Sequence, residues 1–153
     1  MPRFVPNASV TGVDWDAEAI ERCRAALPGE FETIPNEPRP LPVKEVELVL
    51  GHGTLPRLDR AGQAAWLPVL SQAMQSGAYA ALTLRGELLR PFVGDSGVLE
   101  DLDREGISDR PAAGQTMQTR AFTEKLCAGL FDVLAYVEGG VGSEHDLIVL
   151  RKP

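Results

Sequence analysis

The apolar positions of this chain fall into two kinds of segment. Short continuous apolar runs predict buried strands, and they occur at 10–13, 46–50 and 78–84. Between them, apolar residues recur every three or four positions and predict helices over 17–27 and 59–75. Strands that alternate with helices are typical of the α/β class. Parallel strands in such proteins are buried, so we expect the strand over 46–50 to be covered on both faces.

The last third of the chain is more mixed. Ser96 and Thr119 are placed to cap two further helices. The polar segment 107–118 either folds over a site as a substrate cover or is a plain surface loop. Two more strands are predicted over 131–138 and 145–151, separated by a glycine-rich loop.

Length and charge narrow the class of protein. With 153 residues, the chain is expected to form a single domain over 1–153. The net charge is −7 and the 15 basic residues are scattered, which argues against nucleic acid as a partner. No apolar run approaches the 18 residues of a membrane span, so no membrane partner is expected. The first residues do not resemble a secretion signal, which favours a cytoplasmic location.

The two cysteines predict no special chemistry. Cys23 and Cys127 each lie among apolar positions with helical spacing. Neither has other metal-binding residue types at ligand spacing. We therefore interpret both as reduced structural residues and expect no metal site.

The most informative stretch is Ser9-Val10-Thr11-Gly12-Val13-Asp14-Trp15-Asp16. A strand here ends in Asp14, and Asp16 is placed to cap the helix that follows. A carboxylate at the end of a strand in an open α/β sheet can accept hydrogen bonds from both hydroxyls of a ribose. The alternative is an aspartate that merely ends a strand.

Several segments taken in order resemble one known family. They are the stretch 9–16, Pro40-Leu41-Pro42, the run 46–53, the helix that carries Trp66, and the run 77–87. Together they resemble the class I, Rossmann-like, S-adenosylmethionine-dependent methyltransferases, from about Val5 to the last strand. The resemblance implies a three-layer α/β sandwich with a mostly parallel sheet and an antiparallel hairpin at the C-terminus.

The resemblance also implies which residues bind the cofactor, S-adenosylmethionine. Asp14 would accept hydrogen bonds from the ribose and Trp15 would pack against the adenine, unless Trp15 is an ordinary half-buried aromatic. Leu41 falls where a loop of the family covers the adenine. Gly51, His52 and Gly53 fall where the family lines the methionine end of the cofactor.

Two histidines are candidates for the catalytic step. His52 is either a base near the methyl acceptor or a polar residue of the wall. His145 begins the last strand, where the family often carries a polar residue that points toward the substrate. Its alternative role is a turn residue that faces solvent.

The chain departs from the family in ways that leave its function open. The first β–α unit and its glycine-rich loop are missing before Val10, and Ser76-Gly77-Ala78 stands where relatives carry Pro-Gly-Gly. One reading is an enzyme that methylates a small molecule, with its acceptor pocket built from 87–118. The other is a degenerate methyltransferase-like protein that acts through binding or assembly. A third is a truncated piece of a longer protein.

The missing first β–α unit also bears on whether the chain associates with a second copy of itself. In this fold the absent strand would lie between the strands over 10–13 and 46–50. Their backbone groups cannot stay buried without hydrogen-bond partners. Either the two strands pair with each other directly, or a second copy of the chain covers the gap. We therefore expect a homo-oligomer.

Overall fold

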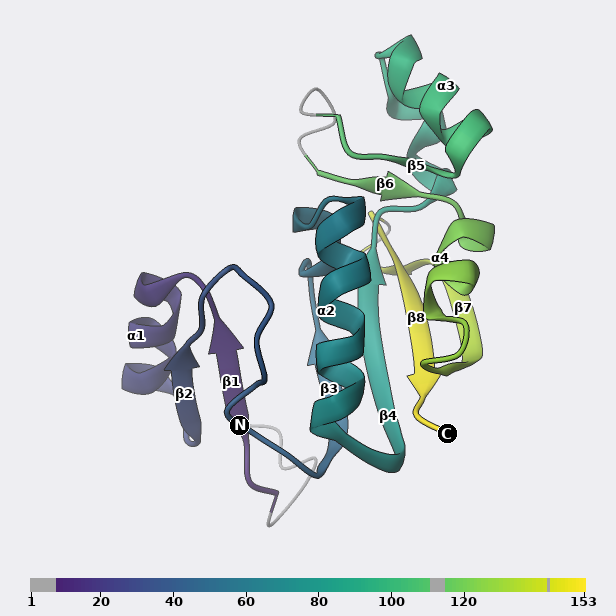
Figure 1. Cartoon of the computed structure of the whole chain (residues 1–153). Helices are drawn as coiled ribbons and strands as arrows, with labels where there is room; N and C mark the ends of the chain where they lie inside the picture. Colours follow the sequence, from purple (N-terminus) through teal and green to yellow (C-terminus); the bar gives the residue numbers. More distant parts are fainter. Residues whose placement is uncertain (1–7, 111–114, 143) are drawn as a thin grey trace. The chain divides into compact units, whose positions relative to one another are not determined.

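The computed structural model describes residues 8–110, 115–142 and 144–153. The chain divides into two compact units, 1–43 and 44–153, which are described separately (Figure 1). Among the residues described, no helix is long and apolar enough to cross a membrane.

The first unit is a small β–α–β arrangement. Strand β1 (Thr11–Asp14) pairs in parallel with β2 (Glu30–Thr33), and helix α1 (Ala17–Ala26) connects them. The predicted helix is confirmed, and Ile20 is its buried residue. The helix was predicted to run to Leu27, but it ends at Ala26, and Leu27 is its extended, half-exposed C-cap.

The second unit is built on a four-stranded sheet in the order β3-β4-β8-β7. Strands β3 (Val46–Gly51) and β4 (Met74–Leu84) are parallel. Strands β7 (Asp132–Val141) and β8 (His145–Arg151) form an antiparallel hairpin, and β8 also pairs antiparallel with β4. The α/β class and the antiparallel C-terminal hairpin are therefore confirmed.

Two helices cover one face of this sheet (Figure 1). Helix α2 (Arg60–Ala73) begins at Asp59, whose side chain accepts a hydrogen bond from the Gly62 N–H at 2.7 Å. Helix α4 (Arg120–Cys127) begins at its predicted cap, Thr119. The core lies between these helices and the sheet, and its buried residues are Leu55, Leu67, Met74, Ala78, Ala80, Leu82, Leu84, Cys127, Phe131, Ile148 and Leu150.

Burial also settles the chemistry of the core cysteine. Desolvation raises the pKa of the Cys127 thiol to about 11. The thiolate is the reactive form of cysteine, so Cys127 is an inert core residue at neutral pH.

The expectation that 46–50 would be covered on both faces is wrong. Val46 and Val49 pack against the core, but Leu48 is 52% exposed and Leu50 is 75% exposed. A run of apolar residues predicts a strand, but it does not reveal whether a second layer covers it. Of the two alternatives for the flanking strands, direct pairing is not formed, because β1 and β3 belong to different sheets.

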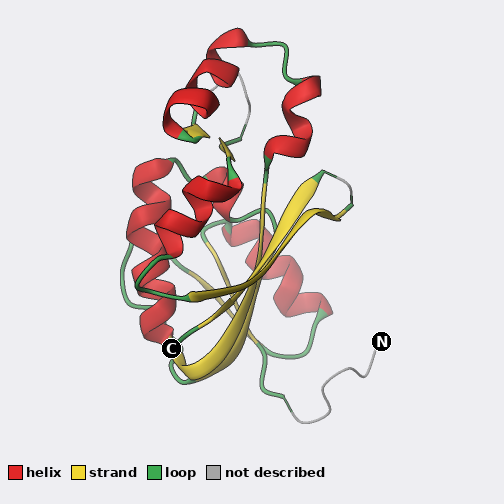
Figure 2. Cartoon of the chain, turned by 90° about the vertical axis from the view of Figure 1, so that its right-hand side faces the viewer, coloured by secondary structure: helices red, strands yellow, loops and turns green. Residues whose placement is uncertain are grey.

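A cap follows β4 and is drawn at the top of Figure 2. It contains the 3-10 helix η2 (Glu87–Phe92), helix α3 (Ser96–Glu105), and the two short paired strands β5 (Ile107–Ser108) and β6 (Met117–Gln118). The cap of α3 is Asp95 and not Ser96, because Asp95 accepts the hydrogen bond from the Gly97 N–H.

The cap has its own small core, in which Val98 and Leu102 of α3 pack with Met117. Ile107 is also buried. The described ends of the segment 107–118 are therefore packed strands and not a plain surface loop. Its middle, 111–114, lies outside the described residues.

Candidate functional site

In the first unit, Asp14 ends β1 with a fixed carboxylate. The backbone N–H of Asp16 donates to Asp14 Oδ1 at 2.9 Å. Asp16 in turn caps α1, accepting from the N–H groups of Glu18 and Ala19 at 3.0 Å. The carboxylates of Asp14 and Asp16 thus link the strand, the turn and the helix by hydrogen bonds to backbone N–H groups. The carboxylate is oriented by one oxygen, and its other oxygen can accept from a ligand.

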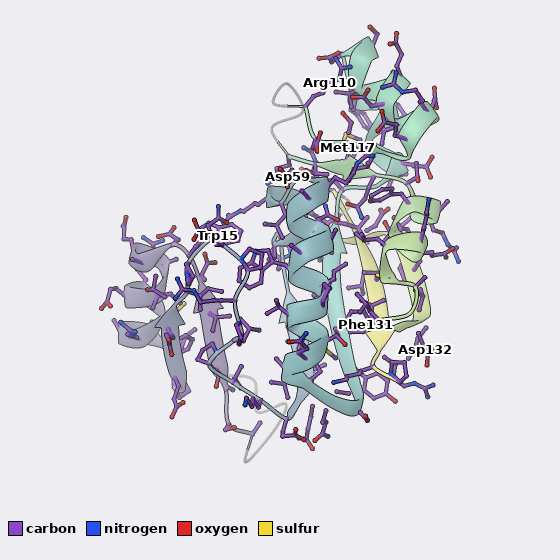
Figure 3. The ribbon with its side chains drawn as sticks, in the orientation of Figure 1. Trp15, Asp59, Arg110, Met117, Phe131 and Asp132 are labelled. Carbon is purple, nitrogen blue, oxygen red and sulfur yellow. The ribbon has the colours of Figure 1, made fainter. Side chains whose placement is uncertain are left out.

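The other candidates of this unit lie near its surface. Trp15 is half-buried in the turn after β1 (Figure 3), and Leu41 is also half-buried. Gly12 is required in β1, because a Cβ there would lie 2.5 Å from the Phe31 ring. The glycine leaves room for the ring of Phe31, its partner on β2, next to the strand that carries Asp14.

In the second unit, the turn after β3 is fastened to the neighbouring strand. The Gly53 N–H donates to Thr83 Oγ1 at 2.8 Å. Gly53 has a φ of +66°, a left-handed conformation that favours glycine. At Gly51 a Cβ would lie 2.8 Å from Leu82 Cδ2, so this position also excludes larger residues. These contacts fix the backbone on both sides of His52.

The two histidines of the chain lie side by side. The ring centres of His52 and His145 are 5.3 Å apart, with a 57° angle between the ring planes. His52 is exposed and follows β3, whereas His145 is half-buried and begins β8. The sequence presented them as separate candidates, and the antiparallel insertion of β8 next to β4 brings them together.

A buried carboxylate that the sequence analysis missed lies next to His145 in the chain. Asp146 accepts hydrogen bonds from the Tyr136 hydroxyl at 2.7 Å and from the Gly139 N–H at 2.9 Å. A Cβ on Gly86 would lie 1.6 Å from Asp146 Oδ2. The Arg120 guanidinium lies over the Tyr136 ring, 5.5 Å from its centre. The available signal in the sequence was an aspartate within an apolar strand, but its two partners lie on the neighbouring strand β7.

This network shifts the titration of the tyrosine. Burial, followed by the hydrogen bond to Asp146, raises the pKa of Tyr136 above its ordinary value of 10.0. In the unfolded chain the phenol ionises near pH 10, whereas in the folded chain it stays protonated. The protonated Tyr136 phenol therefore contributes fully to the free energy of unfolding below pH 10, and this contribution is lost as the pH rises further.

We expect Tyr136→Phe to lower the free energy of unfolding at pH 7 by about 2 kcal/mol, because a hydrogen bond to a buried charge is lost. Above pH 10 the difference from the wild type should narrow, because the variant lacks the ionisable phenol. Urea unfolding at pH 7 and pH 11 measures both effects. Tyr79→Phe, which removes a hydroxyl from a half-exposed side chain, is the control. A Tyr136→Phe difference that stays constant over this pH range would contradict the assignment.

The cap is attached to the carboxyl ends of β3 and β4 by hydrogen bonds to backbone carbonyl groups. The Thr116 N–H donates to the Pro56 carbonyl at 2.8 Å, and its hydroxyl donates to the Leu58 carbonyl at 2.7 Å. The Gln118 N–H donates to the Arg85 carbonyl at 3.0 Å. The cap is thus tied both to the segment after β3 and to the end of β4.

The candidates therefore form one group in each unit. Asp14, Trp15 and Leu41 belong to the first unit, whereas Gly51, His52, Gly53 and His145 belong to the second. Within the described ranges, no three side chains of metal-binding type come together.

The comparisons with known proteins find similarity in structure. No family model matches the sequence, and no curated protein matches it. A SAM-dependent methyltransferase from Methanosarcina mazei matches with a TM-score of 0.70 at 18% identity, over 94% of this chain and 82% of that one. A second from Mesorhizobium loti matches with a TM-score of 0.68 at 15% identity, over 94% and 80%. This chain has the fold of class I SAM-dependent methyltransferases.

Another similar structure is LepI in complex with SAM. It matches with a TM-score of 0.62 at 15% identity, over 97% of this chain and 37% of LepI. At these identities the likeness establishes the fold alone, so activity has to be argued from the residues of this chain.

Those residues fit part of the cofactor expected of a methyltransferase fold. Asp14 offers an oriented carboxylate for ribose hydroxyls. Nothing lies within 4 Å of a Cβ placed on Gly53, so the backbone after β3 is open to close approach at this residue. No glycine-rich turn precedes β1 among the described residues, which begin at position 8. Asp14 therefore suits the nucleoside part of the cofactor, and the turn after β3 suits the groups next to its sulfonium.

Proposed function

We propose that this chain binds S-adenosylmethionine and transfers its methyl group to a small-molecule acceptor. The observation that carries the proposal is Asp14, which ends β1 with its carboxylate oriented by the Asp16 N–H. The methyltransferase fold supports it, because ligands of open α/β sheets bind at the carboxyl ends of the strands.

When bound, the cofactor supplies a sulfonium with a transferable methyl group. The acceptor atom forms a bond to the methyl carbon as the carbon–sulfur bond breaks, and S-adenosylhomocysteine is left. The protein contributes mainly by holding the two reactants in line. An acceptor that loses a proton needs a base, and His52 with His145 is the candidate pair.

The segment 87–118 supplies side chains for acceptor recognition in this proposal. Leu88 and Phe92 of η2 are exposed apolar residues that follow the end of β4. Their chemistry favours an acceptor with an apolar part.

Calorimetric titration with S-adenosylmethionine and S-adenosylhomocysteine tests the proposal. We expect binding in the micromolar range for both ligands. An absence of binding at millimolar ligand would contradict the proposal. It would favour the second candidate function, a methyltransferase-like protein that acts through assembly. That candidate is supported by the exposed apolar side chains of β3, Leu48 and Leu50.

A further inference from the structure

The two neighbouring histidines come from strands that do not pair with each other. The sheet order is β3-β4-β8, so His52, which follows β3, and His145, which begins β8, belong to the two neighbours of β4. Adjacent strands lie about 4.8 Å apart, which separates β3 and β8 by about 10 Å. The ring centres are nevertheless 5.3 Å apart. The two rings therefore meet over the carboxyl end of β4.

The strand register shows on which face of the sheet this happens. Thr83 of β4 pairs with Leu147 of β8, and the side chains of paired residues share a face. His145 lies two residues before Leu147, so its side chain belongs to the same face. The core residues Leu82 and Ile148 belong to the opposite face. The Thr83 side chain thus points to the side of the sheet on which His145 lies.

Thr83 is a buried polar residue that binds the turn after β3. Its side-chain oxygen accepts a hydrogen bond from the Gly53 N–H at 2.8 Å, and Thr83 is only 4% exposed. Ala81, two residues earlier on the same face, is half-buried. The turn after β3 therefore contributes to the burial of Thr83.

The turn needs such a contact because His52 stands between two glycines, Gly51 and Gly53. Glycine restricts the backbone less than any other residue, so these neighbours do not fix the direction of the His52 side chain by themselves. The N–H of Gly53 belongs to the peptide group that joins it to His52. Its hydrogen bond to Thr83 orients that peptide group and thereby the backbone of His52.

The second histidine is held in a comparable way. Asp146, the residue after His145, accepts hydrogen bonds from the Tyr136 hydroxyl at 2.7 Å and from the Gly139 N–H at 2.9 Å. Asp146 and Thr83 are both almost completely buried. Each histidine is thus adjacent to a hydrogen bond made by a buried polar side chain.

We propose that Thr83 is a positioning residue, whose hydroxyl oxygen holds the turn after β3 so that the His52 ring stays next to that of His145. This role rests on the proposed methyl transfer, in which the pair is the candidate base for an acceptor that loses a proton. A base acts only within hydrogen-bond reach of the proton it removes. An imidazole on an unrestrained glycine turn would occupy that position less of the time.

Nuclear magnetic resonance without any cofactor tests the positioning role. In the wild type, the ring protons of His52 and His145 should show a nuclear Overhauser effect, and the Gly53 amide should be protected from hydrogen exchange. Thr83→Val keeps the shape of the side chain but removes the acceptor. The ring contact should disappear, and the Gly53 amide should exchange at least about tenfold faster. Thr83→Ser returns an acceptor oxygen and should restore both signals.

Thr123→Val is the matched control. Thr123 is 1% exposed, and its side-chain oxygen accepts a hydrogen bond from the Gln118 side-chain amide at 2.8 Å. The variant therefore loses a buried hydrogen bond of the same kind in helix α4 and not at the turn after β3. It should keep the histidine ring contact and the protection of the Gly53 amide.

Three results would overturn the proposal: both signals persist in Thr83→Val, Thr83→Ser loses them, or Thr123→Val loses them as well. Calorimetric titration of the wild type with S-adenosylhomocysteine separates this failure from that of the proposed function. Binding by a wild type without the ring contact would remove the role of Thr83 and leave the proposed function standing. The ring contact without binding would support the positioning by Thr83 and contradict the methyl transfer.

Discussion

Gly86→Ala is expected to destabilise the fold by about 3 kcal/mol or more, because its methyl group would occupy the space of a buried carboxylate. The added Cβ would lie 1.6 Å from Asp146 Oδ2 and 3.1 Å from the Tyr136 hydroxyl. Asp146 is 2% exposed and has little room to move. Displacing it breaks hydrogen bonds to a buried charge. Removing one partner of a buried ion pair typically costs about 3–5 kcal/mol, and we expect a loss of similar size here.

Urea unfolding followed by circular dichroism measures this loss. The matched control is Gly94→Ala, because nothing lies within 4 Å of a Cβ at Gly94 and its φ is not positive. That variant should be neutral or slightly stabilising, because alanine restricts the unfolded chain. A Gly86→Ala stability within about 1 kcal/mol of wild type would mean that Asp146 can move at little cost, and the network would lose its structural importance.

The local signals in the sequence predicted most of the secondary structure. Helix caps gave the starts of three helices, since Asp16, Asp59 and Thr119 each accept the expected backbone hydrogen bond. These interactions span only two or three residues, so residue type and spacing are enough to find them. The helix was predicted to reach 75 and the strand to begin at 78, but α2 ends at Ala73. The strand begins at Met74, and Gly77 lies within it.

The outcome at β3 shows the limit of the apolar pattern. Its residues were read as a strand with two covered faces, yet Leu48 and Leu50 are exposed. Burial depends on which other elements reach the strand, and a local run of residues does not contain that information.

The candidate residues were predictable to different degrees. Asp14 belongs to a local strand–turn–helix, so its position could be read from eight consecutive residues. The contact between His52 and His145 depends on the antiparallel order of distant strands. The Tyr136–Asp146 hydrogen bond depends on the pairing of β7 with β8. It also needs the space beside Asp146 that Gly86 leaves free. Such networks become visible only when the strands are aligned.

The largest effect on cofactor binding is expected from Asp14→Ala. In the proposed complex the carboxylate accepts hydrogen bonds from both ribose hydroxyls, and each bond to a charged acceptor contributes about 1.5–3 kcal/mol. Loss of both corresponds to an affinity for S-adenosylhomocysteine at least about 100-fold weaker. The alanine also removes the acceptor of the Asp16 N–H, so the turn after β1 loses its local bond.

Two asparagine variants separate these contributions in the calorimetric titration. Asp14→Asn keeps an acceptor oxygen for the Asp16 N–H but loses the charge, so its affinity should fall about tenfold. Asp16→Asn removes the same charge two residues away and retains a good helix cap, so its affinity should match the wild type. Equal weakening in both asparagine variants would indicate that net charge, and not the position of Asp14, governs binding. Wild-type affinity in Asp14→Ala would remove Asp14 from the cofactor site and with it the main support for the proposed function.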